Sequence, residues 1–374
     1  MNTVEGSLKV KVIRDAIGIR YGKDLYYSFG RSSLYHFIYA YKRFILEIAK
    51  TLLAFMKPIT NLTSTTNLGL YTTHNQHKAL LNASRIGLIN SPILPLHALS
   101  RRGLALRLLV WSAKLVIYPF CFFQSKHRPA LYQTCLLGGM LTYMRLYVKK
   151  IVDLNVEILC VSNDHAGDIY ILTLLIRDKP NLSVDYVQHG AVKAAFPENY
   201  FRNIYVYSNK YAEIYRYLAR NPESNIVVVP AIVGPAHADL PLIDVLICFS
   251  HQFPIVASMA LARTLSKINM VTAAARFHPS DRFSKIKLAL LRLFYPIQYS
   301  DSKVGYATDF ERAKWIVCAS SSLLPDALDK GFGPRLVWAR QLGLKWDYYG
   351  IQGKIREVSC AAEVASLITY RNSQ

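Results

Sequence analysis

The chain has 374 residues, of which 52% are hydrophobic, and its formal net charge is +21. This hydrophobic content excludes an intrinsically disordered chain, and the length exceeds what one core comfortably supports, so we expect two domains. Six scattered cysteines without CxxC spacing suit a reducing compartment and exclude a cysteine-based metal framework, and the start, MNTVEGSLKVKVIRD, has no apolar core of a classical signal peptide.

The positive charge is concentrated in residues 1–152, which hold 21 Lys and Arg against four acidic residues. No carboxylate occurs between Glu47 and Asp153. Such a field attracts a polyanion or an anionic membrane surface, although a solubility effect is the simpler alternative. Nucleic acid is the rival partner, but the chain has no helix-turn-helix spacing, zinc-finger pattern or RNP-like aromatic motif, so we expect no nucleic-acid binding.

Apolar residues from Leu34 to Leu52 recur at helical spacing and predict a basic amphipathic helix of roughly 20 residues that ends before Pro58. This helix could lie on a membrane interface or pack on its own domain. Residues 58–78 are polar and rich in Thr and Asn, and we predict a loop there.

Residues 104–123 form the most apolar run, and it is long enough to span a bilayer. However, Arg107 and Lys114 lie inside it and Pro119 interrupts it. A charge near the bilayer centre costs about 2.5–3.5 kcal/mol even on a permissive scale. We therefore favour a buried or interfacial helix over a transmembrane span.

From about residue 130 apolar strands and helices alternate, which is typical of an α/β protein with parallel sheets. The connector PAIVGPAHADLP at 230–241 is predicted to link two doubly wound, Rossmann-like domains that face a cleft. The first, 1–235, would be an acceptor-side domain with a basic helical region (1–130) and an α/β part (130–235), and the second, 242–374, would bind a nucleotide-sugar. Strands are predicted at 156–161, 184–187, 204–207, 226–229, 242–249, 270–275, 315–318 and 335–339, and helices at 130–152, 169–176, 210–220, 254–267, 285–294, 323–330 and 358–369.

Polar residues follow the predicted strand at 184–187, within VDYVQHGAVKAAFPENY. Gln188, His189 and Gly190 would therefore lie at the carboxyl edge of a parallel sheet, where ligands bind in such folds. His189 can transfer a proton near neutral pH, and Gly190 lets a ligand approach the backbone closely.

A second candidate segment, SNDHAGD, follows the predicted strand at 156–161. It places Asp164 and His165 at the same edge. A carboxylate there can act as a general base. It can equally cap the next helix, because Asp and Asn are favoured at that position.

Two further strand ends lie in the second half of the chain. RFHPSD carries Arg276 and His278, which could both contact phosphate oxygens, although His-Pro is also an ordinary loop dipeptide. CASSS carries Ser320, Ser321 and Ser322 before a predicted helix, where hydroxyls and free N–H groups can hold a phosphate. A single Ser would suffice for capping.

In this order, the segments resemble those of bacterial GT-B glycosyltransferases and polymerases that use cytidine-nucleotide donors. RFHP is similar to the His-Pro motif of sialyl- and polysialyltransferases, and SSSLLPDAL to their serine motif. The SSxxxDA pattern also resembles CDP-glycerol and CDP-ribitol phosphotransferases, which carry Arg-x-His-Pro and an N-domain His-Gly. VSNDHAGD with YVQHGAVKAAFPENY is similar to a segment of capsule and O-antigen transferases. The resemblance covers roughly residues 155–370.

The resemblance implies that His278 and the Ser320–Ser322 run hold the donor phosphate or CMP. It also implies that Asp164 or His189 deprotonates the acceptor hydroxyl. The chain lacks the acidic-acidic-Gly motif of the sialyltransferases, whereas the His-Gly element of the polyol-phosphate transferases favours His189. No DxD-like metal motif is present, so we expect no metal and no cofactor apart from the donor substrate.

These features predict a cytoplasmic glycosyltransferase of surface-polysaccharide synthesis, peripheral on the inner face of the cell membrane. It would transfer a sialic acid or Kdo-type sugar from a CMP-activated donor to a glycan or lipid-linked glycan acceptor. The alternatives are a CDP-glycerol or CDP-ribitol phosphotransferase, a GT-B-like sugar-nucleotide epimerase, and a non-catalytic protein that binds a polyanion or a membrane.

Overall fold

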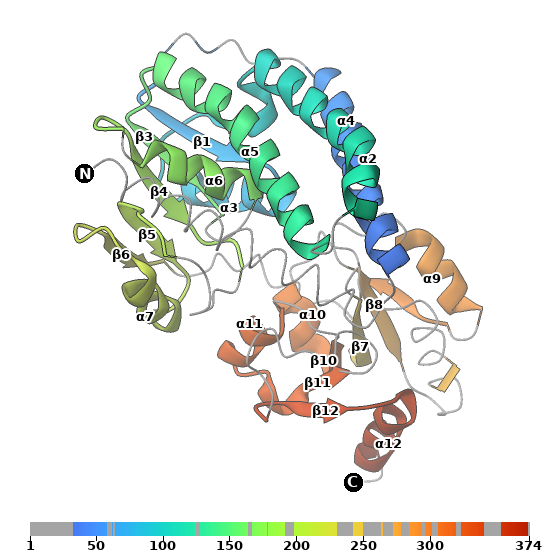
Figure 1. Cartoon of the computed structure of the whole chain (residues 1–374). Coiled ribbons are helices and arrows are strands. Elements are labelled where there is room, and N and C mark those ends of the chain that lie inside the picture. Colours follow the sequence, from blue (N-terminus) through green and yellow to red (C-terminus); the bar gives the residue numbers. More distant parts are fainter. Residues whose placement is uncertain are drawn as a thin grey trace. The chain divides into compact units, whose positions relative to one another are not determined.

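The chain divides into two compact units, Met1–Ala231 and Ile232–Gln374, and each contains a six-stranded sheet (Figure 1). Every strand pairing in the described part of both sheets is parallel. The predicted linker at 230–241 lies outside the described residues. This computed structural model describes residues 33–57, 62, 64–124, 128–163, 167–177, 179–190, 198–229, 242–249, 263–264, 272–277, 284–293, 296–300, 306–318, 323–339 and 353–372.

The sheet of the first unit has the strand order β2-β1-β3-β4-β5-β6. Its order reverses between β1 and β3, because β2 lies on one side of β1 and all later strands lie on the other. Ligands of open parallel sheets bind outside the carboxyl ends of the strands at such a point. The strands are β1 Asn67–Tyr71, β2 Ile93–Pro95, β3 Ile158–Val161, β4 Ser183–Val187, β5 Asn203–Val206 and β6 Asn225–Val228.

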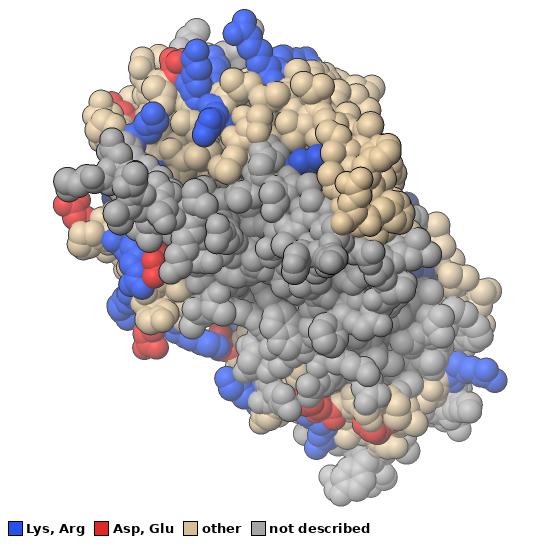
Figure 2. Space-filling view, viewed as in Figure 1, with Lys and Arg blue, Asp and Glu red and all other residues tan. Residues whose placement is uncertain are grey.

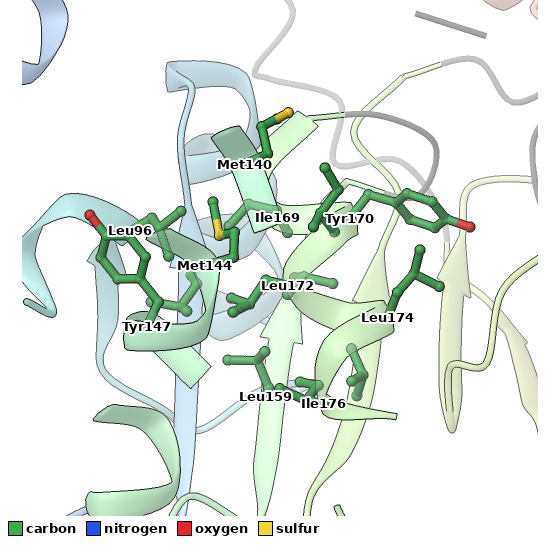
Figure 3. Close-up of a cluster of buried hydrophobic side chains, with 14 of the residues drawn as sticks. Leu96, Met140, Met144, Tyr147, Leu159, Ile169, Tyr170, Leu172, Leu174 and Ile176 are labelled. Carbon is green, nitrogen blue, oxygen red and sulfur yellow. The ribbon is translucent and has the colours of Figure 1, made fainter. Parts of the chain in front are cut away.

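Helices cover both faces of this sheet. Alternate residues of each strand point to opposite faces, so each strand contributes to the core on both sides. Leu159 and Tyr186 belong to the main core, part of which Figure 3 shows, whereas Cys160 and Val187 pack on the other face against Leu80. The predicted doubly wound α/β class is thus confirmed for this unit. Its helices are α2 Ser33–Phe55, α3 His74–Arg85, α4 Arg101–Gln124, α5 Arg128–Asp153, α6 Gly167–Ile176 and α7 Asn209–Leu218, with a 3-10 turn at Leu96–Ala98.

The loop predicted at 58–78 is wrong, because this stretch contains the strand β1 and the start of α3. The strand is short and contains Gly69, which weakens its apolar pattern. A Cβ at Gly69 would lie 3.0 Å from Ile93 Cγ1 of β2, so close approach of the neighbouring strand favours glycine there. The α/β part therefore begins at β1 rather than at residue 130.

Arg107 explains how the apolar helix α4 tolerates an internal charge. Its guanidinium bridges two other helices, since Nη2 lies 2.6 Å from Glu47 Oε2 of α2 and Nη1 lies 2.9 Å from Asp168 Oδ2 of α6. The hydroxyl of Tyr143 in α5 donates to Asp168 Oδ1 at 2.9 Å. The three charged side chains are only 11–14% exposed. We call Glu47, Arg107, Tyr143 and Asp168 the four-helix polar cluster.

The second unit has the strand order β12-β11-β10-β7-β8-β9, which reverses between β7 and β10. Helices α9 and α12 pack on one face of this sheet, and α10 and α11 pack on the other. The doubly wound class is therefore confirmed here too. The strands are β7 Ile243–Phe249, β8 Ala273–Phe277, β9 Gln298–Ser300, β10 Ala313–Cys318, β11 Leu336–Ala339 and β12 Arg356–Val358, and the helices are α9 Ser284–Arg292, α10 Tyr306–Arg312, α11 Leu323–Asp329 and α12 Ala361–Asn372.

Candidate functional site

The carboxyl edge of the first sheet carries polar side chains directly after β3 and β4. Ser162 follows β3, and Gln188 and His189 follow β4. Because β3 and β4 are paired in parallel register, their carboxyl ends lie at the same edge. Sequence reasoning therefore placed Gln188, His189 and Gly190 at the correct edge of the sheet.

Gln188 is fully buried and ties the end of β4 to the end of β5. Its Oε1 accepts from the backbone N–H of Tyr207 at 2.8 Å, and its Nε2 donates to the carbonyl of Gly190 at 2.8 Å. These bonds fix the backbone on both sides of His189. Gln188 thus positions the turn, and its predicted contact with a ligand stays a prediction.

His189 and Gly190 are half-buried beyond this anchored turn. A Cβ built on Gly190 would meet no heavy atom within 4 Å among the described residues. Gly190 is not among the described glycines that have a positive φ. Among the described residues, neither the backbone conformation nor the packing at this position requires a glycine. Among the residues that the structure describes, the space next to Gly190 is open on the chain beside His189.

Replacing Gly190 with alanine should therefore leave the stability of the protein almost unchanged. It should weaken the binding of any ligand that occupies this space. We expect a change of less than about 0.5 kcal/mol in the free energy of unfolding, as for surface positions without strain. Chemical denaturation measures it. Gly87→Ala is the matched control, because Gly87 also has open space but a φ of 74°, where alanine is strained. Equal losses at both positions would contradict the proposed free space.

Asp164 and His165 lie outside the described residues, so their proposed roles stay predictions. The described end of the same motif, Asp168, binds Arg107 and Tyr143 in the four-helix polar cluster. Ser162, at the start of the motif, is fully buried, and its hydroxyl has no hydrogen-bond partner among the described residues. Sequence reasoning assigned no role to Ser162, although its place after β3, at the reversal point, was a usable signal.

In the second unit, two predicted segments follow strands at or beside the reversal point. Ser320, Ser321 and Ser322 come shortly after Cys318, the last residue of β10, and His278 follows Phe277, the last residue of β8. These four side chains lie outside the described residues. Their strands belong to one parallel sheet with β7 between them, so both segments leave the sheet at its carboxyl edge.

Arg276 is buried at the end of β8 and binds an internal carboxylate. Its Nη1 lies 2.6 Å from Oδ2 of Asp309, and Arg312 Nη2 lies 2.8 Å from Oδ1 of the same group. The hydroxyl of Ser300 also donates to Asp309. Asp309 was missed by sequence reasoning, since one carboxylate in an exposed-looking segment gives no signal. The donor-phosphate role of Arg276 stays a prediction, and these contacts favour a structural role.

A cavity of about 190 Å³ lies in the first unit, away from the predicted site. Its lining includes Ser183 and Val184 at the amino end of β4, whereas His189 follows the carboxyl end of that strand. The candidate site at the carboxyl edge of the sheet is therefore distinct from this cavity. In the described part of the chain, no group of three or more His, Cys, Asp or Glu side chains could hold a metal ion.

The chain matches no protein-family profile. No curated protein matches it either. Solved structures resemble it weakly. MnaA of S. aureus with UDP has 9% sequence identity to this chain, and the match covers 73% of this chain and 78% of MnaA with a TM-score of 0.43. UDP-GlcNAc 2-epimerase from Neisseria meningitidis bound to UDP-GlcNAc has 9% identity, 83% and 93% coverage and a TM-score of 0.42. MurG of Acinetobacter baumannii has 13% identity, 89% and 87% coverage and a TM-score of 0.37.

Proposed function

We propose that the protein is a glycosyltransferase of the GT-B class that uses a CMP-activated sugar to extend a bacterial surface polysaccharide. The observation that carries the proposal is the topology of the two sheets. The candidate segments follow β3 and β4 in one unit and β8 and β10 in the other, and β3 and β10 flank the points where the strand orders reverse. Two such sheets supply one edge for an acceptor and one for a nucleotide donor.

In the proposed reaction, His189 accepts the proton of the acceptor hydroxyl as that oxygen attacks the anomeric carbon of the sugar. The bond between the sugar and the CMP phosphate breaks, and CMP leaves with the bonding electrons. His278 and the Ser320–Ser322 run stabilise the negative charge of this phosphate. Asp164 is the rival base. The resemblance of the sequence motifs supports these roles, and the anchoring of His189 by Gln188 is consistent with them.

Thermal unfolding with different nucleotides tests the donor class. A ligand at about 100 times its Kd stabilises the folded state by about 2.7 kcal/mol, which raises the Tm by several degrees. We expect this shift with CMP, CMP-sialic acid or CMP-Kdo. We expect none with CDP-glycerol or with UDP-GlcNAc. Ser321→Ala should reduce the shift, whereas Ser366→Ala, on the exposed side of α12, should not.

Two other outcomes would redirect the assignment. A shift with CDP-glycerol but not with CMP-sugars would favour the polyol phosphotransferase. A shift with UDP-GlcNAc alone, together with its conversion to an epimer, would favour the sugar-nucleotide epimerase. A His278→Ala variant that binds CMP as tightly as the natural protein would remove the proposed phosphate contact.

A further inference from the structure

Helix α4 carries large apolar side chains on its outer surface. Four of them lie seven, four and three positions apart in the sequence, which places them on one face of the helix: Leu109, Val116, Phe120 and Phe123. These four, with Ile117 beside them, are 56–70% exposed. The opposite side of α4 is buried through Trp111, Tyr118 and Phe122. This helix therefore carries large apolar side chains on two opposite sides, but only one of these sides packs inside the protein.

Helix α2 shows the same two-sided pattern. Its inner face is buried through Ala40 and Phe44. Its outer apolar residues are exposed by 49–83%, and the first three of them lie seven positions apart. These residues are Ile38, Ile45, Leu52, Leu53 and Met56, the last just beyond the helix. Packing within the unit explains the inner face but leaves the outer face without a role.

The two helices lie side by side and run antiparallel. Phe37 near the start of α2 contacts Phe123 near the end of α4, and Arg101 at the start of α4 donates to the carbonyl of Phe55 at the end of α2. Figure 2 shows a largely uncharged surface at the upper right, where Figure 1 places α2 and α4. We call the ten exposed apolar residues named above, from α2, Met56 and α4, the apolar ridge. Soluble monomers rarely expose contiguous apolar patches beyond a few hundred Å².

Charge decides between the candidate occupants of the ridge. Lys42, Lys57 and Arg102 are exposed on or next to it, and residues 48–152 contain no carboxylate. A second copy of the chain would bring two strongly basic halves together, and like charges oppose such contact. Anionic lipid headgroups have the opposite charge, and the acyl layer beneath them accepts aliphatic and Phe side chains.

We propose that the apolar ridge docks the protein in the plane of an anionic bilayer surface, with α2 and α4 lying along the interface. One helix of the described chain, Arg101–Gln124, is long and apolar enough to cross a membrane. Crossing would require Arg107 to leave Glu47 and Asp168, whose carboxylates would then be buried without their partner. In-plane docking keeps these ion pairs. The proposal is independent of the proposed activity, since its test uses no donor or acceptor.

Vesicle flotation of the full chain tests the docking. The probes are phosphatidylcholine vesicles with and without about one third phosphatidylglycerol. We expect binding to the anionic vesicles, weakened by salt. The double variant Leu109→Gln with Phe120→Gln should bind about 10- to 100-fold more weakly, since each lost side chain removes apolar burial. Leu242→Gln with Leu293→Gln is the matched control, because these residues are 73% and 74% exposed in the second unit.

Four outcomes would overturn the proposal. The first is equal vesicle binding by the ridge variant and the control. The second is binding that ignores both anionic lipid and salt. The third is retention in vesicles after an alkaline carbonate wash, which would indicate a spanning helix. The fourth is a dimer in light scattering that becomes monomeric in the ridge variant, which would assign the ridge to a second copy. Unchanged Tm values of both double variants verify that each is folded.

Discussion

Replacing Arg107 with leucine is expected to lower the free energy of unfolding by about 3–5 kcal/mol, the loss typical of breaking a buried ion pair. The substitution removes the cation shared by Glu47 and Asp168 and leaves both carboxylates mostly buried. It also removes the guanidinium that lies 5.4 Å from the Tyr143 ring centroid. Denaturant unfolding monitored by Trp fluorescence measures the change. Because α2, α4, α5 and α6 meet at this cluster, we expect the loss to affect the whole first unit.

Lys50→Ala is the matched control, since Lys50 binds the same Glu47 carboxylate at 2.9 Å but is 52% exposed. Its removal should cost less than about 1 kcal/mol, because exposed pairs are weak. Similar losses for Arg107→Leu and Lys50→Ala would show that burial does not strengthen the Arg107 pairs.

The same cluster predicts acid sensitivity. Burial alone would raise the pKa of Glu47, but Lys50 and Arg107 outweigh it and lower the pKa from 4.5 to about 2. A depressed folded-state pKa stabilises the protein above the unfolded-state value, and this contribution is lost as the pH falls from 4.5 to about 2. The Arg107→Leu protein should therefore lose less stability than the natural protein over this range.

Replacing His189 with alanine is expected to lower transfer to the acceptor by about 10²- to 10⁴-fold, the contribution typical of a general base. CMP binding should not change, because the donor contacts are assigned to the other unit. The measurement is CMP release from the CMP-sugar in the presence of acceptor, together with the CMP-induced shift in Tm. Asp164→Ala should reduce the rate less.

Gln188→Ala separates positioning from chemistry. It removes the bonds to Tyr207 and Gly190 and should raise KM and lower kcat together, while His189 remains able to accept a proton. Full activity of His189→Ala with an inactive Asp164→Ala would transfer the base role to Asp164. Activity of both variants would remove the proposed acid–base chemistry from this edge.

Long apolar segments of the fold could be predicted from the sequence, because their pattern reports burial directly. The predicted strand at 242–249 corresponds to β7 and the predicted helix at 210–220 to α7. Short edge elements were missed. β2, β9 and β12 have three residues each, too few to show a period. The strand β1 was missed because Gly69, which β2 requires, interrupts its apolar pattern.

For the candidate site, sequence predicts strand ends better than it predicts partners. The placement of His189 after β4 follows from one apolar run and one Gly, and it is confirmed. The hydrogen-bond and ion-pair partners of Gln188 and Arg276 could not be predicted. Tyr207 and Asp309 are distant from them in the sequence and are brought near only by the fold. Likewise, the sequence shows that Arg107 is unfavourable inside a bilayer, but it does not show which carboxylates bind it. Glu47 lies 60 residues before Arg107, and Asp168 lies in α6, after β3.

The register of β1 with β3 also sets the order in which the chain can fold. Asn67 pairs with Ile158, and the segments of α3, α4 and α5 are all synthesised between them. At about 5–20 residues per second, the ribosome needs roughly 5–20 s to deliver β3 after β1. During that interval α4 is synthesised, but the sheet on which its layer packs is incomplete. We therefore expect chaperones and the bilayer to compete for the nascent chain before β1, with its neighbour β2, can pair with β3.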